Sequence, residues 1–190
     1  MPAPDSAPRT PEDSTDRLDL YRPTLDDVDG LHAILSDPRV WEHFPSLRPT
    51  ERAQTVGRVR RWMAGWDAVG LDTWVARERG GDRIVGYGGC SVLPGGVWNL
   101  GYRFAPAAQG RGFATELSRR AISRAEAARP ASPVIAYLLE HNAASKAVAE
   151  KLGMKLVHRG PDAGNPDPSA VRLVYAFRDL ADTELAAALH

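Results

Sequence analysis

The residues that most clearly indicate chemistry form a glycine-rich turn, Gln109-Gly110-Arg111-Gly112-Phe113-Ala114, between a strand-like run and a run of helical periodicity. The first turn of a helix has unpaired backbone N–H groups and the positive end of the helix dipole, so it binds anions. Gly110 and Gly112 lack side chains that would keep a phosphate away from the backbone, and Ala114 is small for the same reason. Arg111 adds a positive charge at the rim. The turn predicts an anion-binding site, with a glycine turn that only packs under a sheet as the alternative.

Two common phosphate-binding motifs do not fit this turn. A P-loop needs Gly-x-x-x-x-Gly-Lys followed by Ser or Thr, and the sequence contains no such run. The turn also lacks the three glycines of the dinucleotide-binding fingerprint, which normally lies near the start of a wound sheet. Both kinds of nucleotide site are therefore set aside.

The segments around the turn follow alternating strand and helix patterns. Three runs joined by turns of hairpin length predict an antiparallel meander: Thr73–Arg79, Arg83–Leu93 and Val97–Phe104. Apolar positions repeat at helical spacing from Gly110 to Ala128. The unbroken apolar run Val134–Leu139 predicts a strand buried on both faces beside a parallel neighbour. The turn is therefore expected to open the helix of a strand, helix, strand crossover.

Further patterns on either side complete the predicted domain. In chain order they are a strand around Leu18–Tyr21, a helix Leu25–Ser36 capped by Thr24, a helix through Trp62 and Trp66 capped by Thr50, a short helix capped by Asn142 and closed by Gly153, and strands Met154–Arg159 and Ala170–Phe177.

Composition restricts the class of protein. With 190 residues, 24 basic and 24 acidic side chains, the chain fits one globular domain. Zero net charge argues against a general nucleic-acid binder or a binder of anionic membranes. Cys90 is the single cysteine, so no intramolecular disulfide or multi-cysteine metal site forms, and a small buried core residue is the favoured interpretation. No histidine has metal-like spacing, and no metal is expected.

The two ends of the chain are expected to lie outside the domain core. Residues 1–16 contain four prolines and little to bury, which predicts a mobile tail before a domain over residues 17–180. Residues 181–190 are expected to form a short helix or a tail. The first residues lack the cationic and apolar regions of a secretory signal, and no stretch approaches the length of a membrane span, so a cytoplasmic protein is expected.

Two motifs in this order resemble those of a known superfamily. Gln109-x-x-Gly112-x-Ala114, after a strand and before a helix, resembles the Gln/Arg-x-x-Gly-x-Gly/Ala acetyl-CoA signature of the GCN5-related N-acetyltransferases (GNAT). Asn142-x-x-Ser145 followed by Glu150-Lys151-Leu152-Gly153-Met154 resembles an element of the branch that includes the ribosomal-protein alanine N-acetyltransferases. The resemblance covers about residues 17–177. It implies an α/β (α+β) GNAT fold with a mixed, mostly antiparallel sheet of six or seven strands, a splayed parallel pair and flanking helices.

The resemblance also implies a co-substrate, acetyl-CoA, and the residues that hold it. In the family the pantetheine arm lies between the two splayed parallel strands. Backbone groups of the strand before the turn would contact this arm, the turn would bind the pyrophosphate, and two residues of the short helix would contribute side chains. These cofactor-binding residues are Tyr102, Arg103 and Phe104 on the strand, Gln109, Gly110, Arg111, Gly112, Phe113, Ala114 and Thr115 in the turn, and Asn142 and Ser145.

The catalytic residues implied by the family are only partly present. Asn99 stands where the family often has a carboxylate, and an amide can orient a water but cannot accept a proton at pH 7. Ala149 stands where the family often has a tyrosine acid. Ser145 is the candidate for a hydrogen bond to the departing thiolate, with a serine bonded to its own helix backbone as the alternative. Glu140 and His141 are candidate bases, with a solvated loop pair as the alternative.

The acceptor side of the site is expected in the first helix pair and its connecting loop. The candidate substrate-binding residues are Trp41, His43 and Phe44. Together these features predict an N-acetyltransferase that works by direct attack of a neutral primary amine, from a small molecule or from a peptide N-terminus, on the thioester. It would act as a monomer or homodimer. A non-catalytic module that binds or senses acyl-CoA is the alternative.

Overall fold

Eight strands form one sheet in the computed structural model, which describes residues 9–189. The strand order across the sheet is β1-β2-β3-β4-β5-β6-β8-β7. The strands are β1 (Asp13–Ser14), β2 (Leu18–Tyr21), β3 (Thr73–Glu78), β4 (Ile84–Val92), β5 (Trp98–Phe104), β6 (Val134–Leu139), β7 (Lys155–Pro161) and β8 (Val171–Ala176), and the helices are α1 (Val28–Leu35), α2 (Arg52–Val69), α3 (Phe113–Ala128), α4 (Ala143–Lys151) and α5 (Asp182–Leu189).

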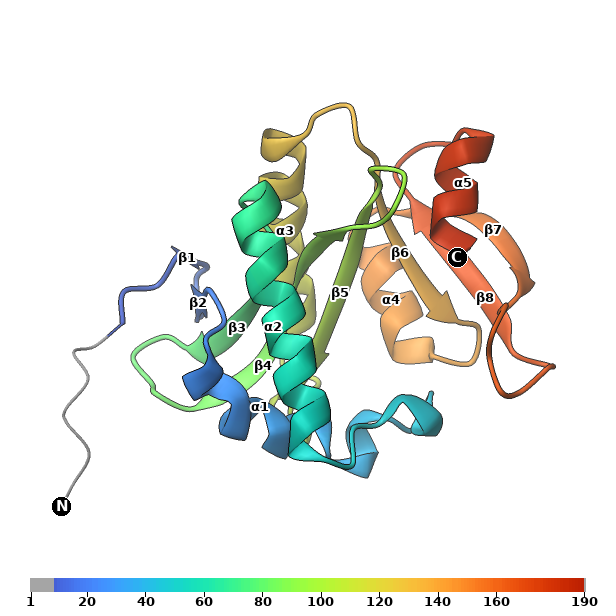
Figure 1. Cartoon of the computed structure of the whole chain (residues 1–190). Helices are drawn as coiled ribbons and strands as arrows, with labels where there is room; N and C mark the ends of the chain where they lie inside the picture. Colours follow the sequence, from blue (N-terminus) through green and yellow to red (C-terminus); the bar gives the residue numbers. More distant parts are fainter. Residues whose placement is uncertain (1–8, 190) are drawn as a thin grey trace, which may run out of the picture.

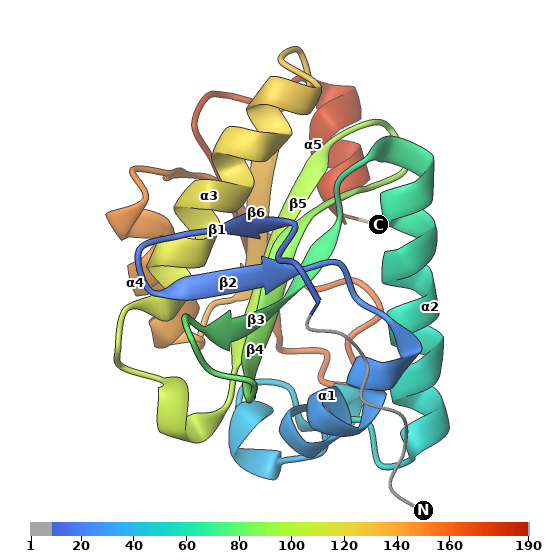
Figure 2. The ribbon, with the colours of Figure 1, turned by 90° about the vertical axis from the view of Figure 1, so that its left-hand side faces the viewer.

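Helices cover both faces of the sheet, as Figures 1 and 2 show. The ring of Tyr87 on β4 packs against Trp62 of α2, with 4.9 Å between the ring centroids. The next residue along β4, Gly88, faces the opposite way and contacts Leu117 of α3. Because successive residues of a strand point to opposite faces, α2 and α3 lie on opposite sides of the sheet. The short helix α4 lies on the α3 side, in contact with α3.

The centre of the sheet contains the one parallel pair. Strand β5 is antiparallel to β4 along its whole length, whereas β5 and β6 are parallel and pair only through Trp98 with Val134 and Asn99 with Ile135. Beyond Asn99 the two strands separate, and β6 pairs instead with β8 on its other edge. The mixed, mostly antiparallel sheet with a splayed parallel pair is therefore confirmed. Among residues 9–189, no strand pairs with the β6-facing edge of β5 from Leu100 onward.

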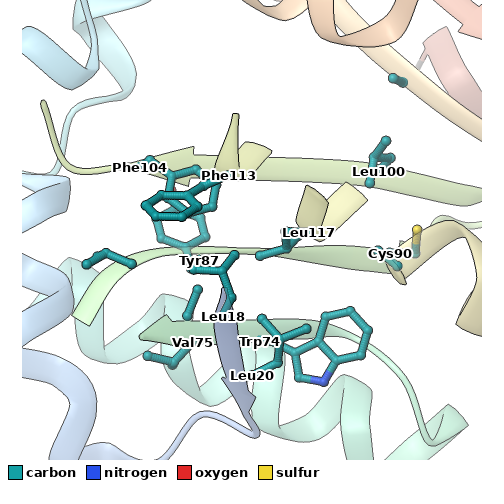
Figure 3. Packing of buried hydrophobic residues seen from close by; sticks show 14 of the residues in the cluster. Leu18, Leu20, Trp74, Val75, Tyr87, Cys90, Leu100, Phe104, Phe113 and Leu117 are labelled. Atoms are coloured by element: carbon teal, nitrogen blue, oxygen red, sulfur yellow. The ribbon is translucent and has the colours of Figure 1, made fainter. Parts of the chain in front are cut away.

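A single large apolar cluster holds the helices against the sheet. Trp74, Phe113 and Leu117 are fully buried within it, and Figure 3 shows Phe113 beside Phe104 at the start of α3. Cys90 is also fully buried, which confirms its interpretation as a core residue, and burial raises the pKa of its thiol. Burial of this apolar surface is the main stabilising contribution to the fold.

The beginning of the ordered chain differs from the sequence-based expectation. Residues 1–8 of the expected tail lie outside the described residues, but Asp13 and Ser14 pair with β2 as an edge strand. The Asp13 carboxylate is nearly buried and accepts hydrogen bonds from Arg120 and Arg124 of α3, at 2.8 Å and 2.7 Å. These charge-assisted bonds hold the segment to the domain. At the other end, α5 occupies most of residues 181–190, for which a helix or a tail was expected.

Two helix starts also differ from expectation. The segment after Thr24 begins as a single 3₁₀ turn, Leu25–Asp27, and becomes α-helical only at Val28. Helix α2 is capped at Glu51 and not at Thr50, and the Gln54 side chain accepts the hydrogen bond from the Glu51 N–H at 3.0 Å. The helix expected from Gly110 begins at Phe113, since Gly112 has a left-handed backbone conformation.

Candidate active site

The glycine-rich turn presents consecutive backbone N–H groups at the start of α3. Gly110 and Gly112 have φ angles of 74° and 82°, a conformation that strains any residue with a Cβ atom. The backbone N–H groups of residues 110–115 have no acceptor among residues 9–189. The Gln109 side chain stabilises the turn by donating a hydrogen bond to the Phe104 carbonyl, at 3.1 Å. The geometry is that of an anion site at a helix N-terminus.

The positive charges at the rim of the turn are held by carboxylates. Arg111 forms a bidentate ion pair with Glu78 on the exposed surface, with Nη1–Oε1 and Nη2–Oε2 distances of 2.6 and 2.8 Å. Arg17 is a rim residue that the sequence did not indicate. It pairs with Glu116 at 2.7 Å and donates to the Arg111 carbonyl, and its Nη2 lies 3.4 Å from the position that a Cβ atom of Gly112 would occupy. Both guanidinium groups lie over the Phe113 ring, at 4.8 and 4.5 Å.

A cleft of about 670 Å³ opens where β5 and β6 separate, which is within the size range of small-molecule sites. Its walls come from α2, β4, β5, β6, α4 and the loop before α2. The cleft brings together eight of the residues singled out in the sequence: Trp41, His43, Phe44, Asn99, Tyr102, Arg103, Asn142 and Ser145.

Asn99 marks the fork between the two strands. It is the last residue of β5 that pairs with β6, and it stands opposite Ser91 on β4. Its Oδ1 atom is buried and has no hydrogen-bond donor among the described residues. A buried carbonyl oxygen without a donor is rare in folded proteins, so Asn99 is suited to accept a hydrogen bond from a bound molecule.

Tyr102 and Ser145 face each other on the α4 side of the fork. Asn142 caps α4 by accepting from the Ser145 N–H at 3.1 Å, which fixes the first turn of the helix. Burial raises the pKa of Tyr102 to about 12, although the nearby Ser145 side chain acts in the opposite direction. Tyr102 is therefore protonated at neutral pH, and two hydroxyl groups that can donate hydrogen bonds lie side by side.

Glu140 is not among the residues that line the cleft. Its carboxylate is exposed and forms an ion pair with Arg159, with a Glu140 Oε1 to Arg159 Nε distance of 2.6 Å. The hydrogen bond from Arg159 is the main reason that the pKa of Glu140 lies below its usual range. The neighbouring His141 ring lies 2.8 Å from the His43 carbonyl oxygen. The structure therefore ties both candidate bases to protein partners and brings neither side chain into the cleft lining.

Asp72 is a carboxylate in the cleft that the sequence did not indicate. It is only 6% exposed, accepts from the Thr73 N–H at 2.6 Å, and has its pKa raised chiefly by burial. The carboxylate packs against Gly65 of α2 so closely that a Cβ atom there would lie 2.0 Å from Oδ2. A glycine inside a helix pattern was the only signal of this contact, since it indicates a close neighbour without naming it.

One wall of the cleft is aromatic and cationic. The Trp41 indole is anchored by a 2.6 Å hydrogen bond from Nε1 to the Leu35 carbonyl. The Arg103 guanidinium lies 3.5 Å from the centre of the Trp41 ring and donates to the Val40 carbonyl at 2.7 Å. Burial, together with the charges of Arg103 and His141, lowers the pKa of His43 to about 4. His43 is therefore neutral at physiological pH.

No group of three or more histidine, cysteine or acidic residues within residues 9–189 is arranged to hold a metal ion. None of the described helices has both the length and the apolar character required to span a membrane.

Comparison with known proteins identifies the family of this site. Residues 17–155 match the family described as "Acetyltransferase (GNAT) domain". Among curated proteins, YkkB of Bacillus subtilis (strain 168), itself uncharacterised, is 28% identical over 151 residues, 74% of this chain and 83% of YkkB.

Solved structures share the fold at low sequence identity. A GnaT-family acetyltransferase from Bordetella pertussis has a TM-score of 0.73 at 21% identity, with 87% of this chain and 98% of that chain covered. The ribosomal L7/L12 α-N-protein acetyltransferase RimL, in complex with coenzyme A, has a TM-score of 0.69 at 20% identity, with 90% and 97% covered.

Proposed function

Because the chain belongs to the GNAT acetyltransferase family and is an N-acetyltransferase, we propose that it acetylates a primary amine of a small molecule or of a peptide N-terminus by direct attack on acetyl-CoA. The observation that carries this proposal is the cleft at the fork between β5 and β6. The anion-binding turn opens on the α3 side of the sheet, whereas α2 borders the cleft on the other side. A thioester donor and an amine acceptor entering from these two sides would meet at the fork. RimL, by its name an α-N-protein acetyltransferase, supports the peptide option.

The described residues fit acetyl-CoA in two places. The N–H groups of residues 110–115 have no acceptor among the described residues and point to a pyrophosphate, which the helix dipole of α3 also favours. The β6-facing edge of β5 at Tyr102, Arg103 and Phe104 has backbone groups without a partner strand, and an extended pantetheine arm would supply one. When bound there, acetyl-CoA would supply the activated acetyl group.

The chain provides groups for each proton and charge in the transfer. We assign the base to Asp72, because it is the cleft carboxylate without an ion-pair partner among the described residues and because its raised pKa makes it a stronger proton acceptor. Asn99 Oδ1 would orient the amine by accepting one of its hydrogens. The Tyr102 backbone N–H or a neighbouring one would stabilise the negative charge that develops on the acetyl oxygen. The Tyr102 and Ser145 hydroxyls would donate to the departing thiolate.

A free-thiol release assay tests this function. The purified chain, acetyl-CoA and a panel of amines and short peptides should give thiol release that depends on the amine. Mass spectrometry should detect an acetylated amine as the second product. Binding of coenzyme A without amine-stimulated thiol release from any acceptor would instead support the non-catalytic acyl-CoA module.

A further inference from the structure

One face of α2 carries two arginines into the cleft. Arg58, Arg61, Trp62 and Gly65 follow one another at helical spacing, so they share the face of the helix that is turned toward the sheet. Arg58, Arg61 and Trp62 line the cleft, and Gly65 packs on Asp72 at its wall. The Arg58 guanidinium lies 5.5 Å from the centre of the Trp41 ring. The acceptor side of the cleft is therefore bordered by positive charge.

These charges lack carboxylate partners. Of the four arginines that line the cleft, Arg172 is paired with Asp162. The other three, Arg58, Arg61 and Arg103, have no carboxylate oxygen within 4.0 Å among residues 9–189. Asp72 is the remaining acidic residue of the lining, and His43 is neutral at physiological pH. The cleft thus has an excess of two positive charges within the described residues.

The burial of Arg103 makes this excess of positive charge energetically unfavourable. Its guanidinium is largely buried and is held by neutral groups, the Val40 carbonyl and the Trp41 ring. Burial lowers the pKa of Arg103, which is the sign of a charge removed from water without full compensation. Guanidinium groups bind carboxylate and phosphate oxygens with two parallel hydrogen bonds, so an anion at this wall would compensate the charge.

The phosphates of acetyl-CoA do not provide this anion in the proposed arrangement. They would lie at residues 110–115 on the α3 side of the sheet, whereas Arg58 and Arg61 are on α2, on the other side. An anion that compensates Arg58, Arg61 and Arg103 would therefore have to enter with the acceptor.

We infer that the acceptor is a small amine that carries an acidic group, a carboxylate or a phosphate, which Arg58 and Arg61 bind while the amine faces Asn99 and Asp72. This inference rests on the proposed function and names its substrate class. A cleft of about 670 Å³ suits an acceptor of amino-acid size. The positive charges of Arg58 and Arg61 would also favour an acceptor with an acidic group over a neutral amine of the same size.

Matched pairs of amines test the acidic group in the thiol-release assay. Propylamine is compared with β-alanine, and ethanolamine with O-phosphoethanolamine, each at a pH that gives equal fractions of free amine. The member with the acidic group should have a kcat/KM at least about tenfold higher, the effect of one charge-assisted contact. The first pair reports on a carboxylate and the second on a phosphate, so the two sources are distinguished.

Arginine variants locate the effect on α2. Arg58→Gln and Arg61→Gln should each raise KM for the preferred acidic amine by about tenfold and leave KM for acetyl-CoA and for the neutral amine unchanged. Arg60→Gln, an exposed position on the same helix outside the cleft lining, is the matched control and should behave as the wild type. Arg61→Glu should reverse the preference toward the neutral amine. Circular dichroism of each variant checks that α2 is intact.

Two results would overturn the inference in distinguishable ways. Wild-type activity on neutral amines that equals or exceeds activity on their acidic counterparts would reject the anionic acceptor and leave the proposed function standing. Equal loss of activity toward both members of a pair in the Arg58→Gln and Arg61→Gln variants would likewise reject the anionic acceptor. Thiol release that no amine or peptide of the panel stimulates would reject the proposed function and the inference together.

Discussion

Asp72 is a buried carboxylate in the cleft, and its burial affects both catalysis and stability. Burial raises its pKa above the value of an exposed aspartate, which makes ionised Asp72 a better proton acceptor. The same burial makes the ionised side chain unfavourable for folding. A group whose folded pKa is raised adds stability at pH below its unfolded pKa, and this stability is lost as the pH rises through the folded value.

Asp72→Asn should therefore have opposite effects on turnover and stability. We expect kcat/KM for the amine to fall about 100-fold or more and the acidic limb of the pH–rate profile to disappear, because the base is gone. Thermal unfolding at pH 7 should show a fold that is at least as stable as the wild type. Glu140→Gln is the matched carboxylate control and should retain full turnover. A normal pH–rate profile in Asp72→Asn would assign the base elsewhere.

Tyr102 and Ser145 should act as a unit. Tyr102→Phe and Ser145→Ala are each expected to lower kcat by about tenfold to 100-fold with little change in KM for acetyl-CoA, because each removes one donor to the thiolate. The double variant should lose little more than either single variant, since the effects of neighbouring groups that act on the same atom are not additive. Steady-state kinetics of the four proteins measure the coupling. Fully additive losses would mean that the two hydroxyls work independently.

The phosphate turn depends on its backbone conformation and on its open N–H groups. Gly112→Asp should strain the turn by about 1 to 2 kcal/mol and place a carboxylate where the pyrophosphate binds, so Kd for coenzyme A should rise by more than about tenfold. Gly164→Asp, in the loop between β7 and β8 with a φ angle of 81°, carries the same strain and charge far from the turn. Calorimetric titration of both variants should show weakened binding only for Gly112→Asp.

The elements near the turn were predictable because local patterns dominate them. The strand Val134–Leu139 has the predicted bounds, since an unbroken apolar run leaves few alternatives for a strand buried on both faces. The Asn142 cap was equally predictable, because the cap forms with a residue three positions away. The cleft residues Tyr102, Arg103, Asn142 and Ser145 were expected from the resemblance of two short motifs to those of the GNAT family.

The unpredicted features depend on contacts between distant parts of the sequence. Strand β1 is held by Arg120 and Arg124, which are 107 and 111 positions from Asp13, so its proline-rich surroundings gave no sign of order. The contact between Asp72 and Gly65 depends on how tightly α2 packs on the sheet. The excess of arginines in the cleft likewise appears only when α2, β5 and the loop before α2 are brought together.

The hydrogen bonds that Asp13 accepts from Arg120 and Arg124 hold β1 against α3, the helix that starts at the phosphate turn. The Asp13 carboxylate is desolvated, which acts to raise its pKa, but the hydrogen bond from Arg120 and the nearby charges bring the pKa below its usual range. A lowered folded pKa contributes stability at pH above the unfolded value, and this contribution is lost as the pH falls through the folded value.

Asp13→Ala should lower the free energy of unfolding by about 1 to 2 kcal/mol at pH 7, because Arg120 and Arg124 are partly exposed and remain hydrated. The difference from the wild type should shrink as the pH falls below about 3.9, the usual aspartate value. Urea titrations at several pH values measure it. Asp16→Ala, at an exposed neighbouring position, should have no such effect, and a pH-independent difference would show that the charge of Asp13 is not responsible.

The isolation of Cys90 in the core decides how cleanly the reaction can be followed. As the sole cysteine of the chain, fully buried and with a raised thiol pKa, it should neither react with a thiol-detecting dye nor form a mixed disulfide with released coenzyme A while the fold is intact. The colour that develops in the native assay would then come from product alone. The same dye added in denaturant would report one protein thiol per chain and so give the enzyme concentration.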